Sequence, residues 1–147
     1  MPADFAYTVI DKCPYAVLTM IDTQGKPYAV PLSIARADAV IYFHSAMQGE
    51  KTDILRQNPE VCLVGVDNVN PLPKEFSTEY ESAIIRGRAA EVTDKEEKIL
   101  ALRLICERYI PENMAEFEQM VAKSLERTAI WRIDVEDITG KRKIAPK

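Results

Sequence analysis

The segment that decides the fold is VIYFHSAMQGEKTD, residues 40–53, in which a strand passes into a helix. Residues 40–45 are mostly β-branched or aromatic, which predicts a strand, whereas residues 50–58 have the composition of a helix. Gly49 is placed to bend the chain between them. Because side chains alternate along a strand, one face should carry Val40, Tyr42 and His44, and the other Ile41, Phe43 and Ser45.

The helix start after Gly49 is a candidate anion site. The first backbone N–H groups of a helix are unpaired, and together with the positive end of the helix dipole they attract an anion. Lys51 adds a mobile ammonium and Thr52 a hydroxyl donor, which suits a phosphate monoester. Many helices begin with the same residue types and bind nothing, so an ordinary helix start is the alternative.

His44 is the only histidine in the chain, and it lies at the predicted strand end beside the glycine bend. A histidine there is either a hydrogen-bonded structural residue or a proton donor to a bound ligand, and the pattern leaves both open. The three cysteines, Cys13, Cys62 and Cys106, are far apart and mostly flanked by apolar residues. They are predicted to be reduced structural thiols, and no metal site is expected.

Length and composition favour one globular domain spanning residues 1–147. Hydrophobic residues make up 47% and charged residues 29%, the net charge is -4, and the basic residues are dispersed. A nucleic-acid partner is therefore not expected. No apolar run approaches the roughly 18 residues that span a bilayer, and the first residues include acidic ones, unlike a signal peptide. We expect a cytoplasmic protein with no membrane partner.

The rest of the chain predicts further strands and helices joined by turns. Strands 15–21 and 61–66 are apolar on both faces, which predicts burial inside a barrel. Residues 67–79 are predicted to form the longest loop, and residues 141–147 a solvated tail. The other expected elements are strands 28–35, 82–92 and 128–138, and helices 4–12, 94–109 and 113–124.

Two of these strands carry features that bear on function. Pro31 breaks the ladder of its strand, which predicts an edge strand or a bulge. Leu32 and Ser33 would then offer backbone groups to a flat heterocycle, although simple edge protection explains the proline equally well. Arg86 and Arg88 share one face of their strand, where they would meet a phosphate or pair with surface carboxylates.

About six strands with helices against them indicate an α+β protein, mainly β, built on a small antiparallel barrel. Three runs, residues 30–66, 80–111 and 125–142, resemble the pyridoxamine phosphate oxidase-like FMN-binding split barrels. Within that family they are most similar to the nitroimidazole-resistance type of flavin-nucleotide-binding protein. The most specific motif is FHSAMQGEK, residues 43–51, followed by ITGK, residues 138–141. The resemblance implies a six-stranded antiparallel split β-barrel with flanking helices.

The resemblance also implies a homodimer with FMN at the interface of the two chains. The backbone of Leu32 and Ser33 would line the isoalloxazine ring. The ring and ribityl chain would lie beside His44, Ser45 and Ala46, and the phosphate would be held by Gly49, Lys51 and Thr52. Arg86, and Trp131 of the partner chain, are further expected contacts.

These expectations lead to three functional hypotheses. The first is an FMN-dependent oxidoreductase that acts on small electron-poor compounds, as a nitroreductase does in nitroimidazole resistance, with His44 as the catalytic residue. The alternative is a flavin- or haem-binding protein of the same fold that has no turnover. The third is a purely structural dimer. The sequence names neither the substrate nor the electron donor.

Overall fold

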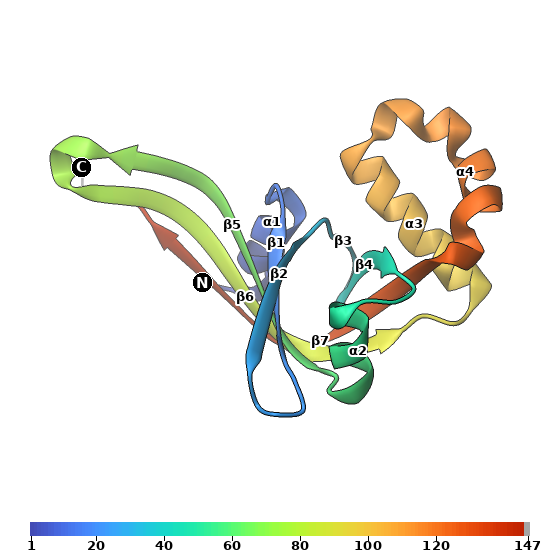
Figure 1. Cartoon of the computed structure of the whole chain (residues 1–147). Helices are drawn as coiled ribbons and strands as arrows, with labels where there is room; N and C mark the ends of the chain where they lie inside the picture. Colours follow the sequence, from blue (N-terminus) through green and yellow to red (C-terminus); the bar gives the residue numbers. More distant parts are fainter. Residues whose placement is uncertain (146–147) are drawn as a thin grey trace.

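The computed structural model describes residues 1–145, which form one antiparallel sheet of seven strands flanked by helices (Figure 1). The strand order is β2-β1-β5-β6-β7-β4-β3. The strands are β1 Ala16–Ile21, β2 Pro27–Leu32, β3 Ala35–Ala37, β4 Val40–Ala46, β5 Glu60–Leu72, β6 Ser77–Glu91 and β7 Thr128–Lys143. The helices are α1 Ala3–Lys12, α2 Glu50–Gln57, α3 Lys95–Tyr109 and α4 Phe117–Ser124, with short 3-10 turns η1 Pro73–Glu75, η2 Pro111–Glu116 and η3 Leu125–Arg127.

The predicted α+β split barrel is confirmed, but the predicted number of six strands is wrong. The strand expected at residues 28–35 ends at Leu32, and a separate strand, β3, follows the break. The break occurs because Ile34 is bonded outside the sheet: its N–H donates to the Tyr109 hydroxyl (3.2 Å) and its carbonyl accepts from Arg108 (2.9 Å). The sheet is not closed, since β2 and β3 are its two edges. Pro31 therefore lies on an edge strand, as predicted.

The predicted loop at residues 67–79 is wrong, because it is largely strand, and the tail predicted at residues 141–147 is strand as far as Lys143, while its last two residues lie outside the described part of the chain. β5 continues to Leu72, β6 begins at Ser77, and β7 extends to Lys143. Together they form an arm that projects from the barrel on the side away from α3 and α4 (Figure 1). At its tip Phe76 is 96% exposed and has a left-handed backbone (φ 49°).

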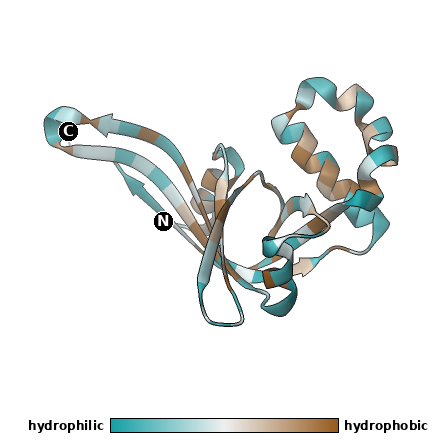
Figure 2. Cartoon of the chain, in the orientation of Figure 1, coloured by the Kyte–Doolittle hydropathy of each residue, from teal (hydrophilic) through white to brown (hydrophobic). Residues whose placement is uncertain are grey.

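The chain builds two hydrophobic cores on opposite faces of β4 and β7. Ile41 and Phe43 enter the barrel core, whereas Tyr42 enters a second core against α3 and α4, so the predicted alternation along residues 40–45 is confirmed. β7 divides in the same way, with Trp131 in the barrel core and Ile130 in the helical core. The apolar sides of α3 and α4 are visible as brown segments turned towards each other and the sheet (Figure 2).

β1 and β5 have one buried face, where the sequence predicted two. Leu18 and Leu63 are fully buried in the barrel. The opposite side of the sheet is apolar yet open: Ile84 is 42% exposed, and its cross-strand neighbour Val64 is half-buried. We call this side the outer face, and it consists of Val17, Thr19, Cys62, Val64, Val66 and Ile84.

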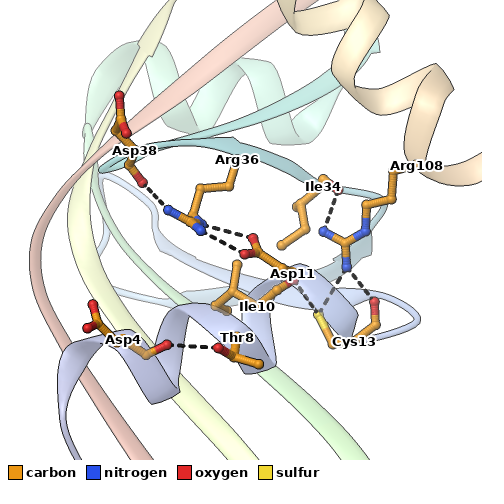
Figure 3. A network of polar contacts seen from close by, with 9 residues as sticks. All are labelled: Asp4, Thr8, Ile10, Asp11, Cys13, Ile34, Arg36, Asp38 and Arg108. Carbon is orange, nitrogen blue, oxygen red and sulfur yellow. Dashed lines mark hydrogen bonds and ion pairs between the residues drawn. The ribbon is translucent and has the colours of Figure 1, made fainter.

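A polar network fastens α1 and α3 to the residues that follow β2, including β3 (Figure 3). Arg108 of α3 donates to the carbonyls of Ile34 (2.9 Å) and Cys13 (2.6 Å). Nearby, Arg36 pairs with Asp11 (2.7 Å) and donates to the Asp38 carbonyl (2.8 Å). Hydrogen bonds from a guanidinium to buried carbonyls are strong, so the residues after β2 are held firmly in place.

Candidate functional site

The bend between β4 and α2 exposes the start of a helix. Gly49 precedes α2 with φ 151° and ψ 173°, a backbone conformation that favours glycine. Its carbonyl accepts the first helical bond, from the Asp53 N–H (3.0 Å). Among residues 1–145, none accepts a hydrogen bond from the N–H groups of Glu50, Lys51 or Thr52. The helix therefore presents three free donors and the positive end of its dipole.

Lys51 adds a cation to this helix start. The side chain is half-buried, with Nζ 5.8 Å from the centre of the Phe43 ring, and burial lowers the pKa of its ammonium group. Within the described chain no carboxylate forms an ion pair with it. A half-buried ammonium without a counter-ion next to free N–H donors is well suited to a phosphate.

His44 lies near this cation, on the last part of β4. Burial lowers the pKa of its imidazole, and the positive charge of Lys51 lowers it further. The ring keeps a part of its surface exposed. His44 is thus neutral at neutral pH in the free protein. An anion bound at Lys51 would weaken the repulsion by which Lys51 lowers the pKa of His44.

The hydroxyl groups beside the bend are already engaged. Thr52 is 1% exposed and donates to the Gly49 carbonyl (2.9 Å). Ser45 is 9% exposed and donates to the carbonyl of Ala46, which is itself exposed (2.9 Å). A hydroxyl has one hydrogen, so the predicted donation from Thr52 to a phosphate would require its bond to Gly49 to break.

Ser33 and His44 meet at a cavity of about 400 Å³. Ser33 is exposed just after β2, while Leu32 before it is 7% exposed and packs in the barrel core. The cavity walls opposite Ser33 and His44 come from α3 and α4, two helices that were not predicted to lie at the site. Their apolar stripes were a visible signal, but a stripe does not reveal which sheet face it covers. The lining residues are Ser33, His44, Leu102, Ile105, Cys106, Tyr109, Ile110, Met120, Ser124 and Thr128.

The structure does not bring Arg86 or Trp131 to this cavity. Arg86 is exposed on β6 and lines a separate cleft of about 510 Å³ beside the outer face, together with Cys62 and Glu136. Trp131 is 2% exposed and stacks on Phe43 inside the barrel (6.5 Å between ring centres). Its indole nitrogen has no hydrogen-bond partner among the described residues. In the single chain Trp131 therefore exposes almost no surface, and its contact with a flavin of a partner chain stays a prediction.

Two features are absent from the described part of the chain. In residues 1–145 no group of three or more His, Cys, Asp or Glu side chains is arranged to hold a metal ion. None of the helices in the same range is both long enough and apolar enough to cross a membrane. The three cysteines are all free thiols.

Comparison with known proteins gives a family for the chain. A family model described as pyridoxamine 5'-phosphate oxidase matches residues 3–142. A search of curated proteins found no match.

Solved structures with the same fold include flavin and haem proteins. A candidate 5-nitroimidazole antibiotic resistance protein from Bacteroides thetaiotaomicron is 24% identical, with a TM-score of 0.82 over 95% of this chain and 82% of that one. The flavocytochrome Anf3 from Azotobacter vinelandii is 21% identical, with a TM-score of 0.82 over 99% and 69% of the two chains. The FAD- and haem-binding protein from Mycobacterium smegmatis is 19% identical, with a TM-score of 0.82 over 98% and 72%.

Proposed function

The chain belongs to the pyridoxamine 5'-phosphate oxidase family, and on that premise we propose that it is an FMN-binding flavoprotein. The observation that carries the proposal is Lys51, a half-buried ammonium at the free start of α2 that has no carboxylate partner within residues 1–145. FMN ends in a phosphate monoester, which supplies the missing charge. The neighbouring Ser33 and His44 would lie beside the isoalloxazine ring.

We further propose that the protein is an oxidoreductase for small electron-poor compounds such as nitroaromatics. FMN would supply electrons in pairs, and reduction of a nitro group to a nitroso group consumes two electrons and two protons and releases water. His44 would hold one of those protons. Burial is the larger cause of the lowered pKa of His44 and repulsion by Lys51 the smaller one; phosphate at Lys51 would weaken that repulsion, which favours protonation of His44 in the flavin-loaded protein.

The outer face supports a homodimer with the flavin at the interface. Its apolar side chains lie side by side on the sheet, and Val66 and Ile84 are 39% and 42% exposed in the single chain. Arg86 lies beside this face and outside the cavity that holds His44. If it contacts a flavin, that flavin would be the one bound by the partner chain. The free thiols support action in the cytoplasm.

Haem binding without turnover is the second candidate. It is favoured by the position of His44, the sole histidine, at the edge of a cavity with mainly apolar walls. Of the solved structures with the same fold, one is a flavocytochrome and another is an FAD- and haem-binding protein.

One experiment separates the candidates. The visible spectrum of freshly purified protein is recorded, and the chromophore released by heat is identified by mass spectrometry. Flavin absorption with released FMN is the expected result. A haem band without flavin supports the second candidate. Protein that is colourless and takes up neither FMN nor haem on titration contradicts both.

Turnover is tested on the FMN-loaded protein under anaerobic conditions. Bleaching by NADH or NADPH, followed by reoxidation with a nitroaromatic acceptor, is expected for the oxidoreductase. If dithionite-reduced protein is not reoxidised by the acceptor, the protein binds flavin without this activity.

A further inference from the structure

The cavity beside His44 has walls of one chemical kind. Of its ten lining residues, six are Leu, Ile, Cys, Tyr or Met side chains from α3, α4 and the turn between them, and none carries a formal charge at neutral pH. Burial raises the pKa of Cys106, so that thiol stays neutral too. The cavity is therefore an apolar space whose polar groups gather at one end, where Ser33, His44 and Thr128 lie.

Hydrogen bonds within the protein already occupy much of the wall. The Tyr109 hydroxyl accepts the Ile34 N–H (3.2 Å), and the Arg108 guanidinium lies 5.1 Å from the Tyr109 ring centre. Arg108 is itself committed to two backbone carbonyls. The Ser124 hydroxyl donates to the Met120 carbonyl (2.8 Å). A charged ligand group on this side of the cavity would lose its water and meet at most one donor, the Tyr109 hydroxyl, which accepts from Ile34 and still has its own hydrogen to donate.

Volume and adaptability limit the occupant further. A cavity of about 150 Å³ holds benzene, so one of about 400 Å³ has room for one or two substituted rings. Met120 on one wall has a flexible and polarisable side chain, which suits contact with aromatic rings. Ser33 and His44 at the polar end are also the residues expected beside the flavin.

We propose that the cavity between β4 and the α3–α4 pair binds an uncharged aromatic compound of one or two rings, with its polar substituent towards His44 and Ser33. The proposal deepens the proposed function, since it rests on that function for the role of the compound as electron acceptor. It assigns the substrate class by charge: neutral acceptors are bound, and anionic analogues of the same shape are rejected.

The test compares methyl 4-nitrobenzoate with 4-nitrobenzoate, which have the same ring and nitro group and differ in charge. Binding to the FMN-loaded protein is followed by NMR, through the ring signals of His44, the sole histidine, and the methyl signal of Met120. We expect the ester to shift both signals and to bind at least about tenfold more tightly than the acid, because of the cost of burying a carboxylate. Equal affinity for the two compounds would overturn the proposal.

Cavity-filling variants test the location. Met120→Trp, on a half-buried position, and Ile110→Trp, on a position that is 43% exposed at the rim, should each weaken binding of the ester and leave FMN affinity unchanged. Leu100→Trp is the matched control, because Leu100 is on α3 but 46% exposed and outside the cavity. Undiminished binding of the ester in both folded cavity variants refutes the location.

Flavin titration keeps this proposal apart from the proposed function. If the wild-type protein binds no flavin but still binds the ester with the expected charge preference, the cavity assignment stands and the proposed function fails. If FMN binds and the ester does not, the cavity assignment alone fails. If the purified wild-type protein shows a haem band and Met120→Trp does not, haem occupies the cavity, and the proposal is overturned.

Discussion

Replacing Lys51 by Met tests the phosphate site most directly, because methionine is an unbranched side chain that is shorter than lysine only by the ammonium group and carries no charge. A hydrogen bond from a charged group to a ligand contributes about 1.5–3 kcal/mol. Lys51 is half-buried, so solvent screens this contact less than it would at the surface. Its loss should raise the Kd for FMN by about 10- to 150-fold. The free N–H groups of α2 remain, so FMN binding should weaken without disappearing.

Riboflavin lacks the phosphate and provides the comparison. Fluorescence titration of wild type and Lys51→Met with both ligands should show a large loss for FMN and less than about a threefold change for riboflavin. Lys26→Met is the matched control, since Lys26 is exposed in the turn between β1 and β2 and is not part of the helix start that carries Lys51. Equal losses for FMN and riboflavin would refute the phosphate role and assign Lys51 to the fold.

The apo form of the same variant gives an independent readout. Burial lowers the pKa of Lys51, so the charged side chain costs free energy in the folded protein and its removal should not lower the melting temperature. Removing the charge should also raise the pKa of His44, which one NMR titration can follow because the chain has a single histidine. A falling melting temperature and an unchanged His44 titration would show that Lys51 has another role.

Four other predictions concern the site and the scaffold. His44→Gln should retain FMN and lower the rate of flavin reoxidation by a nitroaromatic by about 10- to 100-fold, measured by anaerobic stopped flow; an unchanged rate assigns His44 to structure. The pKa of His44 is lower in the folded protein than in the unfolded chain, so folding favours the neutral imidazole. The stability that this difference provides is present above about pH 6.5 and is lost as the pH falls through the folded pKa. Below about pH 6.5, the free energy of unfolding in urea should therefore depend less on pH in His44→Gln than in wild type. Ile84→Lys places a charge on the outer face and should sediment as a monomer, whereas Leu100→Lys on α3 should remain a dimer. If both variants sediment as dimers, the interface lies elsewhere. Gly87→Ala would put a Cβ into the Asp134 carbonyl oxygen and should cost more than about 3 kcal/mol in thermal unfolding. Gly25→Ala, with open space and φ 76°, should cost about 1–2 kcal/mol; similar losses for the two variants would show that Asp134 does not crowd Gly87.

The strand-to-helix turn was predictable because its signals are local. The strand was expected at residues 40–45 and is Val40–Ala46, and the helix was expected at 50–58 and is Glu50–Gln57. β-branched and aromatic residues, a glycine and a helical composition follow one another there within a few residues. The free helix start and Lys51 depend only on this local order, so this part of the candidate site could be proposed before the structure.

The arm could not be predicted, because its sequence lacks the pattern that a half-buried strand has. Period-two alternation arises when one face of a strand is buried, whereas residues 68–71 are exposed on both faces. Asn68 and Asn70 resemble loop residues, yet they donate to Glu81 (2.7 Å) and Glu79 (3.0 Å) on the neighbouring strand. Strand pairing, which is not local in sequence, stabilises this segment.

The cavity walls escaped prediction for a related reason. Cys106, Tyr109 and Met120 lie more than 60 residues after His44, and an apolar helix stripe is usually a packing surface. Tertiary hydrogen bonds hold α3 against the end of β2: the Ile34 N–H donates to the Tyr109 hydroxyl, and Arg108 donates to the Ile34 carbonyl. The break in the predicted strand at Ser33 has the same cause.

The position of β7 has a consequence for how the chain folds. β7 is last in the sequence but central in the sheet, where it pairs with β6 over twelve positions and with β4 over seven. Until Thr128–Lys143 leaves the ribosome, β4 lacks its principal partner and one edge of β6 stays unpaired. Such pairings between distant segments slow folding, and unpaired edges promote aggregation of nascent chains. Chains truncated before residue 128 should therefore accumulate as aggregates, and chaperones that shield strand edges should raise the yield of the complete protein.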